Sequence, residues 1–185
     1  SFSFIWGRKD WENGRMKKRI YRNFLEIKSI KFLKEKNKPN KDLKIEKLEI
    51  DNFQINKFFY KQIGKDYSWK DRLIWTDNKW VKYVKDKNVH TYILKKNVDF
   101  VGFFELIHHE SKNEIEIAYF GILSEYFDQG IGGFMLSEAI KSSFSFNVNR
   151  VWVHTCSLDH SNALKNYLAR GMKIYLNEFF EKKTA

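Results

Sequence analysis

The chain has very little of what marks cross-linked, secreted or membrane-spanning proteins. Only one of its 185 residues is cysteine, Cys156, and only one is proline, Pro39. A single cysteine excludes a disulfide framework and fits a reducing compartment. No apolar run approaches the length of a membrane span, and the first residues lack the apolar core of a signal peptide. These absences predict a cytoplasmic protein that does not associate with a membrane.

Positive charge, by contrast, is in excess. Lysine and arginine number 34 against 23 acidic residues, a net charge of +11. An excess of this kind gives only unspecific attraction to nucleic acid, and it equally suits a polyanionic small ligand or a compositional bias towards lysine, asparagine and isoleucine. We therefore do not expect a nucleic-acid partner. A hydrophobic content of 43% and an aromatic content of 17% predict one folded domain with a real core.

Residues 1–42 differ from the rest of the chain. They are rich in Lys, Arg and Asn, with only short apolar stretches such as that at 24–27, and Pro39 begins a turn or linker. We interpret 1–42 as an N-terminal extension, with an added strand and a linker, and 43–185 as the main domain. Met16 could be a natural start, in which case residues 1–15 would not be native. The stretch at 24–27 could add an edge strand or contact a partner in a homodimer.

From Leu43 onward, hydrophobic periodicity predicts regular elements. A helix capped by Asp51 and ended by Gly64 precedes two short helices, and a hairpin turning at 95–97 follows them. The strands are predicted at 43–50, 90–94, 98–107, 114–123, 150–156 and 173–180, and the later helices at 68–75, 77–84, 131–144 and 162–170. This order predicts an α/β class (α+β mixed sheet), a central sheet with helices on both faces.

The junction between the strand at 114–123 and the following helix carries the clearest chemical signal. A polar turn ends in Gly130-Ile131-Gly132-Gly133, and a helix-like run follows from Phe134, with Ile131 already at helical spacing. Glycines let the backbone approach a ligand, and the free N–H groups and dipole at a helix start suit an anion such as a pyrophosphate. A lone glycine pair would fit a simple helix-start turn equally well.

Three segments together resemble the GNAT N-acetyltransferase superfamily. They are 120–136 with the glycine loop, Val-Trp-Val-His-Thr at 151–155, and Ala-Leu-Lys-Asn-Tyr-Leu-Ala-Arg-Gly-Met at 163–172. In that family the loop reads Arg/Gln-x-x-Gly-x-Gly/Ala. Here Phe127 stands where Arg or Gln is usual and Ser124 where proline is common, but both loop glycines match. The resemblance covers the chain from about Leu43 and implies the acyl-CoA N-acyltransferase fold.

The resemblance implies acetyl-CoA as the donor substrate and requires no metal. Backbone N–H groups of the loop would bind the pyrophosphate, and the strand end would pair with the pantetheine arm. His160 stands where the family often has Asn near the cofactor. The expected acetyl-CoA contacts are Ile122, Leu123, Ser124, Gln129, Gly130, Ile131, Gly132, Gly133, His160 and Asn162.

Catalysis needs a proton donor and a proton acceptor. By resemblance, Tyr167 is the general acid that protonates the departing thiolate, although the same ring could simply pack on the sheet. Glu116 is the first candidate for the base, because strand alternation places it on one face with Ala118 and Phe120. Glu105 is the second candidate. Either carboxylate could instead be solvated, with water and backbone carbonyls serving as the base.

An aromatic-rich stretch follows the first long helix. By resemblance this stretch forms a wall of the acceptor site. We assign four residues to the acceptor site, namely Trp69, Arg72, Trp75 and Glu105. Aromatic rings with one arginine suit an acceptor that has an apolar body and a carboxylate. The same rings could equally well cap the core.

The sequence thus predicts a transferase, an acetyl-CoA-dependent N-acetyltransferase acting by direct transfer on a primary amine of a small molecule. Two alternatives stay open. The acceptor could be a protein lysine or N-terminus, or the chain could be a CoA- or RNA-binding module that has lost transfer. The identity of the amine and the length of the acyl group are not encoded in any motif of the chain.

Overall fold

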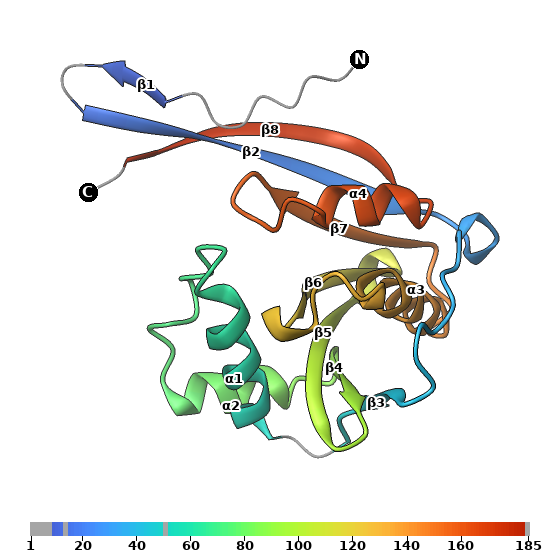
Figure 1. Cartoon of the computed structure of the whole chain (residues 1–185). Helices are drawn as coiled ribbons and strands as arrows, with labels where there is room; N and C mark the ends of the chain where they lie inside the picture. The colour runs from blue at the N-terminus through green and yellow to red at the C-terminus, as the bar shows by residue number, and fades with distance from the viewer. Residues whose placement is uncertain (1–8, 13–14, 50–51, 184–185) are drawn as a thin grey trace.

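One mixed β-sheet organises the computed structural model, which describes residues 9–12, 15–49 and 52–183. Its strand order is β1-β2-β7-β6-β5-β4-β3, with β8 pairing to β2. Figure 1 shows the sheet with helices on either side of it. The strands are β1 (Lys9–Glu12), β2 (Arg15–Ile27), β3 (Leu43–Lys47), β4 (Val89–Lys96), β5 (Asp99–His109), β6 (Glu114–Ile122), β7 (Arg150–Cys156) and β8 (Lys173–Lys183). The longer helices are α1 (Phe53–Gly64), α2 (Asp77–Val84), α3 (Ile131–Phe144) and α4 (Ala163–Ala169), and η1 (Ile30–Phe32), η2 (Glu110–Lys112) and η3 (Ser124–Tyr126) are short 3-10 turns.

The helices cover the two faces of the sheet with separate apolar clusters. On one face Met135 and Ile140 of α3 are fully buried against strand residues such as Ile115. On the other face Phe59 and Ile63 of α1 pack on Phe103 and its neighbours. Burial of large apolar side chains on both faces is what fixes these layers. The predicted mixed sheet with helices on both faces is confirmed. None of the described helices is long and apolar enough to cross a membrane.

The strand β2 lies inside the sheet. It pairs antiparallel with β7 over Arg22–Ile27 on one edge and with β8 along most of its length on the other. Leu25, whose partner on β7 is Val153, is completely buried. Residues 15–27 of the N-terminal segment therefore belong to the same sheet as the strands that follow Leu43.

The strands β6 and β7 are parallel and separate after a short contact. Their pairing runs only from Glu114–Arg150 to Glu116–Trp152. Beyond this point the edge of β6 that faces β7 has no strand partner among the described residues. Figure 1 shows the two halves of the sheet diverging there. The opening leaves backbone groups of β6 accessible from inside the sheet.

Two local predictions differ from the structure. The stretch 68–75 forms turns rather than a helix, because Ser68 has a positive φ of 60° and the hydrogen bonds that follow are three residues apart, as from Trp75 N–H to the Arg72 carbonyl. The first predicted strand ends at Lys47. Asn52 caps α1, its side chain accepting from the Gln54 N–H at 3.2 Å. The predicted cap Asp51 lies outside the described residues.

Candidate functional site

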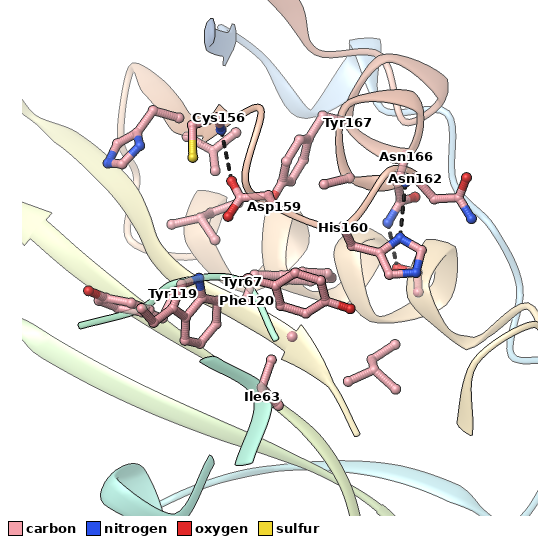
Figure 2. A pocket seen from close by; sticks show the side chains of 18 of the residues that line it. Ile63, Tyr67, Tyr119, Phe120, Cys156, Asp159, His160, Asn162, Asn166 and Tyr167 are labelled. Atoms are coloured by element: carbon pink, nitrogen blue, oxygen red, sulfur yellow. Dashed lines mark hydrogen bonds between the residues drawn. The ribbon is translucent and has the colours of Figure 1, made fainter. Parts of the chain in front are cut away.

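A cavity of about 1020 Å³ lies where β6 and β7 separate. It follows β6 from Glu116 to Ile122, about 20 Å at roughly 3.3 Å per residue of strand. Residues of β2, β7, β8, α1, α4 and the start of α3 complete its walls. Figure 2 shows Tyr167, Asp159 and Phe120 around this space. The volume lies at the upper end of the range of small-molecule and cofactor sites.

The glycine loop forms the end of the cavity nearest α3. Gly130 takes a left-handed conformation at φ 74° and starts the helix without a side-chain cap. The first turn of α3 therefore presents backbone N–H groups to the cavity, which Gly130, Ile131, Gly132 and Gly133 all line. Asn166 of α4 holds the loop in place, since its side-chain amide donates to the Gly132 carbonyl at 3.0 Å.

Three other predicted cofactor contacts lie outside the cavity lining. Leu123 donates its N–H to the Val101 carbonyl at 2.8 Å, so that this group is already used within the sheet. Ser124 belongs to η3, and Gln129 donates its side-chain amide to the Glu125 carbonyl at 3.3 Å. Ile122 does line the cavity.

His160 and Asn162 both line the cavity between β7 and α4. The His160 Nδ1 accepts from the Asn162 N–H at 3.0 Å, as Figure 2 shows. Its ring makes edge contacts with Tyr67, with 5.9 Å between centroids, and with Phe127, at 4.9 Å. Phe127, which stands where the family loop usually has Arg or Gln, thus packs against the His160 ring.

Tyr167 projects from α4 into the cavity and is 6% exposed. Its ring meets Phe120 edge-on at 6.3 Å, and within the described part of the chain its hydroxyl has no hydrogen-bond partner. Burial is the main cause that raises the pKa of Tyr167 above its usual value, and the negative charge of the nearby Asp159 carboxylate raises it further. The phenol is therefore protonated at neutral pH and able to donate.

Asp159 is held in a tight turn beside Tyr167. Its Oδ2 accepts from the Thr155 hydroxyl at 2.7 Å and from the Cys156 N–H at 2.8 Å. Both bonds fix the loop that leads from β7 into α4. Burial raises the pKa of the Cys156 thiol, so that this side chain is a neutral wall of the cavity.

Glu116 lines the cavity near the point where β6 and β7 part. Its Oε1 lies 3.0 Å from the His109 Nε2, and its side chain is 17% exposed. Phe120 does not lie on the same face of β6 as Glu116, contrary to the alternation predicted from the sequence. The β5–β6 register shifts at Ala118, and Phe120 packs on the cluster that contains Ile117. An irregularity in the strand changes which face the later residues occupy.

Arg72 and Glu105 form a buried ion pair. The Arg72 Nη1 lies 2.9 and 3.1 Å from the two carboxylate oxygens of Glu105, and the two side chains are 6% and 0% exposed. Asn56 and Tyr83 also donate to this carboxylate, at 2.9 and 3.2 Å. Glu105 therefore does not reach the cavity, and Arg72 lines the cavity with Nη1 already engaged.

Aromatic rings surround the Arg72 guanidinium. Its carbon lies 4.1 Å from the ring centre of Tyr119, 4.2 Å from Tyr83 and 4.7 Å from Trp75. Such contacts stabilise a desolvated cation. Of the four residues predicted for the acceptor wall, Trp69 and Arg72 line the cavity, whereas Trp75 and Glu105 lie behind it.

The cavity also has walls that sequence reasoning missed. Ile20 and Arg22 come from β2, and Phe180 comes from β8. The Arg22 guanidinium lies over the Phe180 ring at 4.8 Å. Burial and the nearby Arg22 lower the pKa of His154 on β7. No motif identifies these residues, because they reach the site only through the insertion of β2 between β7 and β8.

Comparison with known proteins shows the family to which the chain belongs. The family model "Acetyltransferase (GNAT) family" matches residues 46–172. The chain belongs to this family, as its sequence predicts. No curated protein matches the sequence at a significant level.

Solved structures share the fold at low sequence identity. A GCN5-related N-acetyltransferase from Kribbella flavida is 12% identical, with TM-score 0.63, covering 89% of this chain and 58% of that one. A functionally unknown conserved protein from Staphylococcus epidermidis is 18% identical, with TM-score 0.59 and coverage of 90% and 62%. An aminoglycoside acetyltransferase from an uncultured soil metagenomic sample, in complex with sisomicin, is 17% identical, with TM-score 0.55 and coverage of 69% and 85%. The chain spans about six tenths of the length of the first two structures.

Proposed function

We propose that the protein is an acetyl-CoA-dependent N-acetyltransferase that acts on a primary amine of a small molecule. The observation that carries the proposal is the continuity of the cavity. It joins the glycine loop, the buried Tyr167 and the carboxylate of Glu116 along one open edge of β6. A long donor entering over the loop would direct its thioester towards Tyr167, and the acceptor would approach from the side of Glu116.

Each step of direct transfer then has a candidate group in the cavity. Glu116 takes the proton from the acceptor ammonium, and the free amine attacks the thioester carbonyl. Collapse of the tetrahedral intermediate breaks the carbon–sulfur bond while the attacking nitrogen releases its second proton to water, and Tyr167 protonates the departing thiolate. Its phenol recovers a proton from solvent. No covalent enzyme intermediate and no metal enter the proposed sequence of steps.

The shape of the acceptor side favours a small molecule over a protein amine. Trp69, Tyr67 and Phe180 wall it with aromatic surface, and strands lie on two sides of it. Arg22, Glu116 and Glu181 add charges of both signs, which suits a polar amine better than an extended peptide.

Release of CoA thiol from acetyl-CoA, measured across a panel of amines, tests the proposal. The panel holds polyamines, an aminoglycoside, arylamines, amino acids and a lysine-containing peptide. We expect amine-dependent release with at least one small amine and none with the peptide. Release with the peptide alone would show that the acceptor is a protein amine and not a small molecule. Binding of CoA without release by any amine would favour a module that has lost transfer.

The Glu116 assignment has its own test. Glu116→Gln should lower kcat by about 100-fold with an alkylamine, because the ammonium loses its proton acceptor. With an arylamine, which is already neutral in the assay, the loss should be much smaller. Glu110→Gln, on the exposed η2 turn beside the same strand, is the matched control and should leave kcat unchanged. Equal losses with both amines would remove Glu116 from proton transfer.

A further inference from the structure

Two basic side chains lie over the glycine loop, and one of them comes from outside the segment that the family model matches. Lys36 follows η1 in the connection between β2 and β3, and Arg170 follows α4. Figure 1 shows this connection, in light blue, running past α3. Lys36 lines the cavity together with the loop.

The connection is fixed to the site through its backbone. The Lys36 N–H donates to the Ser137 hydroxyl of α3 at 2.9 Å, and the Lys34 N–H donates to the Arg170 carbonyl at 2.9 Å. The Ser137 hydroxyl donates in turn to the Gly133 carbonyl at 2.8 Å. The position of the Lys36 backbone therefore does not depend on its own side chain.

Both side chains converge on the start of α3. A methyl group on Gly133 would collide with the Arg170 guanidinium and with the Lys36 side chain. One on Gly130 would lie 3.5 Å from the Lys36 Nζ. The two cations thus share the space directly over the first turn of the helix.

Neither cation has an anionic partner there. Within the part of the chain that the structure describes, no carboxylate pairs with Lys36 or Arg170, and the buried Arg170 Nε has no hydrogen-bond partner. Two like charges that meet over the positive end of a helix dipole repel one another unless an anion lies between them. The arrangement therefore favours a bound polyanion.

The loop itself supplies no such charge. Its own charged side chains are the carboxylates Glu125 and Asp128, and Phe127 packs on His160. We propose that Lys36, assisted by Arg170, binds the phosphate groups of the acyl-CoA donor and replaces a basic side chain that the loop lacks. This inference rests on the proposed function, because it names the groups that would hold the donor of that reaction. It makes the β2–β3 connection part of the binding site.

Calorimetric titration of the full chain with CoA tests the assignment. Lys36→Ala should raise the Kd for CoA about tenfold, as expected for loss of a charge-assisted contact to phosphate. Lys36→Arg should restore most of the affinity. Lys38→Ala is the matched control, because Lys38 is a neighbouring exposed lysine outside the cavity lining, and it should leave the Kd unchanged.

Two shortened ligands identify which phosphate is held. If Lys36 binds the pyrophosphate, the effect of Lys36→Ala persists with 3′-dephospho-CoA; if it binds the 3′-phosphate, the effect disappears. With acetyl-pantetheine as donor, which has no phosphate, Lys36→Ala should turn over at the wild-type rate. An equal loss with acetyl-pantetheine, or a Kd for CoA like that of Lys38→Ala, would overturn the assignment. Failure of the wild type to bind CoA would instead overturn the proposed function.

Discussion

Replacing Tyr167 with Phe should lower kcat by about 100-fold and leave the Kd for CoA nearly unchanged. The change removes one hydroxyl and keeps the ring that packs on Phe120. The loss therefore reports on proton donation to the departing thiolate and not on the wall of the cavity. Stopped-flow or steady-state thiol release gives kcat, and calorimetry with CoA gives the Kd. Tyr126→Phe, which removes a hydroxyl from the same cavity, is the matched control.

The pH dependence adds a second measurement. Because burial raises the pKa of Tyr167, the donating form persists as pH rises. The wild-type kcat should show no decline from this group below the ordinary tyrosine value of about 10. A Tyr167→Phe enzyme with unchanged kcat would show that water protonates the thiolate, and Tyr167 would then be a packing residue.

Replacing Glu105 with Ala should lower the free energy of unfolding by about 3–5 kcal/mol, because it leaves the Arg72 charge buried without its partner. Asn56 and Tyr83 lose their acceptor in the same step. Urea unfolding followed by tryptophan fluorescence measures the change. Glu46→Ala, which removes a carboxylate from an exposed pair with Lys95, should leave the midpoint nearly unchanged.

The combined replacement of Arg72 by Met and Glu105 by Leu separates charge from packing. It should be less destabilising than Glu105→Ala alone, since no unpaired charge is left in the core. At temperatures where each variant is folded, the acceptor KM should stay close to the wild-type value. A large increase in KM would show that Arg72 contacts the acceptor directly, as its place in the cavity wall allows.

The sequence predicted the core of the fold because the local signals there are strong. The bounds of β7 agree with prediction, those of α4 agree to within a residue at each end, and α3 ends where its apolar spacing predicts, although it begins at Ile131 inside the predicted glycine turn. The helix predicted at 68–75 does not form, although its local signal is of the same kind. Its apolar residues recur at helical spacing, but Trp69 packs onto Gly64 so closely that a side chain at 64 would collide with it. Tertiary contact there overrides local preference.

The site was predictable where one motif carried it, and not where distant segments met. Gly130, Gly132 and Tyr167 line the cavity as their motif positions suggested, although their roles stay predictions. The pairing of Arg72 with Glu105 could not be foreseen, because it depends on side-chain directions across α1, α2 and the sheet. Lys36 was equally hidden, since nothing in its neighbourhood marks it among the many lysines of the chain.

The place of β2 has a consequence for how the polypeptide acquires its structure during synthesis. This strand is synthesised well before β7 and β8, the two strands with which it pairs over most of its length. Its apolar residues, Leu25 among them, must stay uncovered while the intervening chain is translated. Such long-range pairing slows folding and prolongs the exposure of an unpaired, aggregation-prone strand edge. The β3–β6 unit, whose strands are neighbours in sequence, can form first, and β7, β2 and β8 are then added on the free edge of β6.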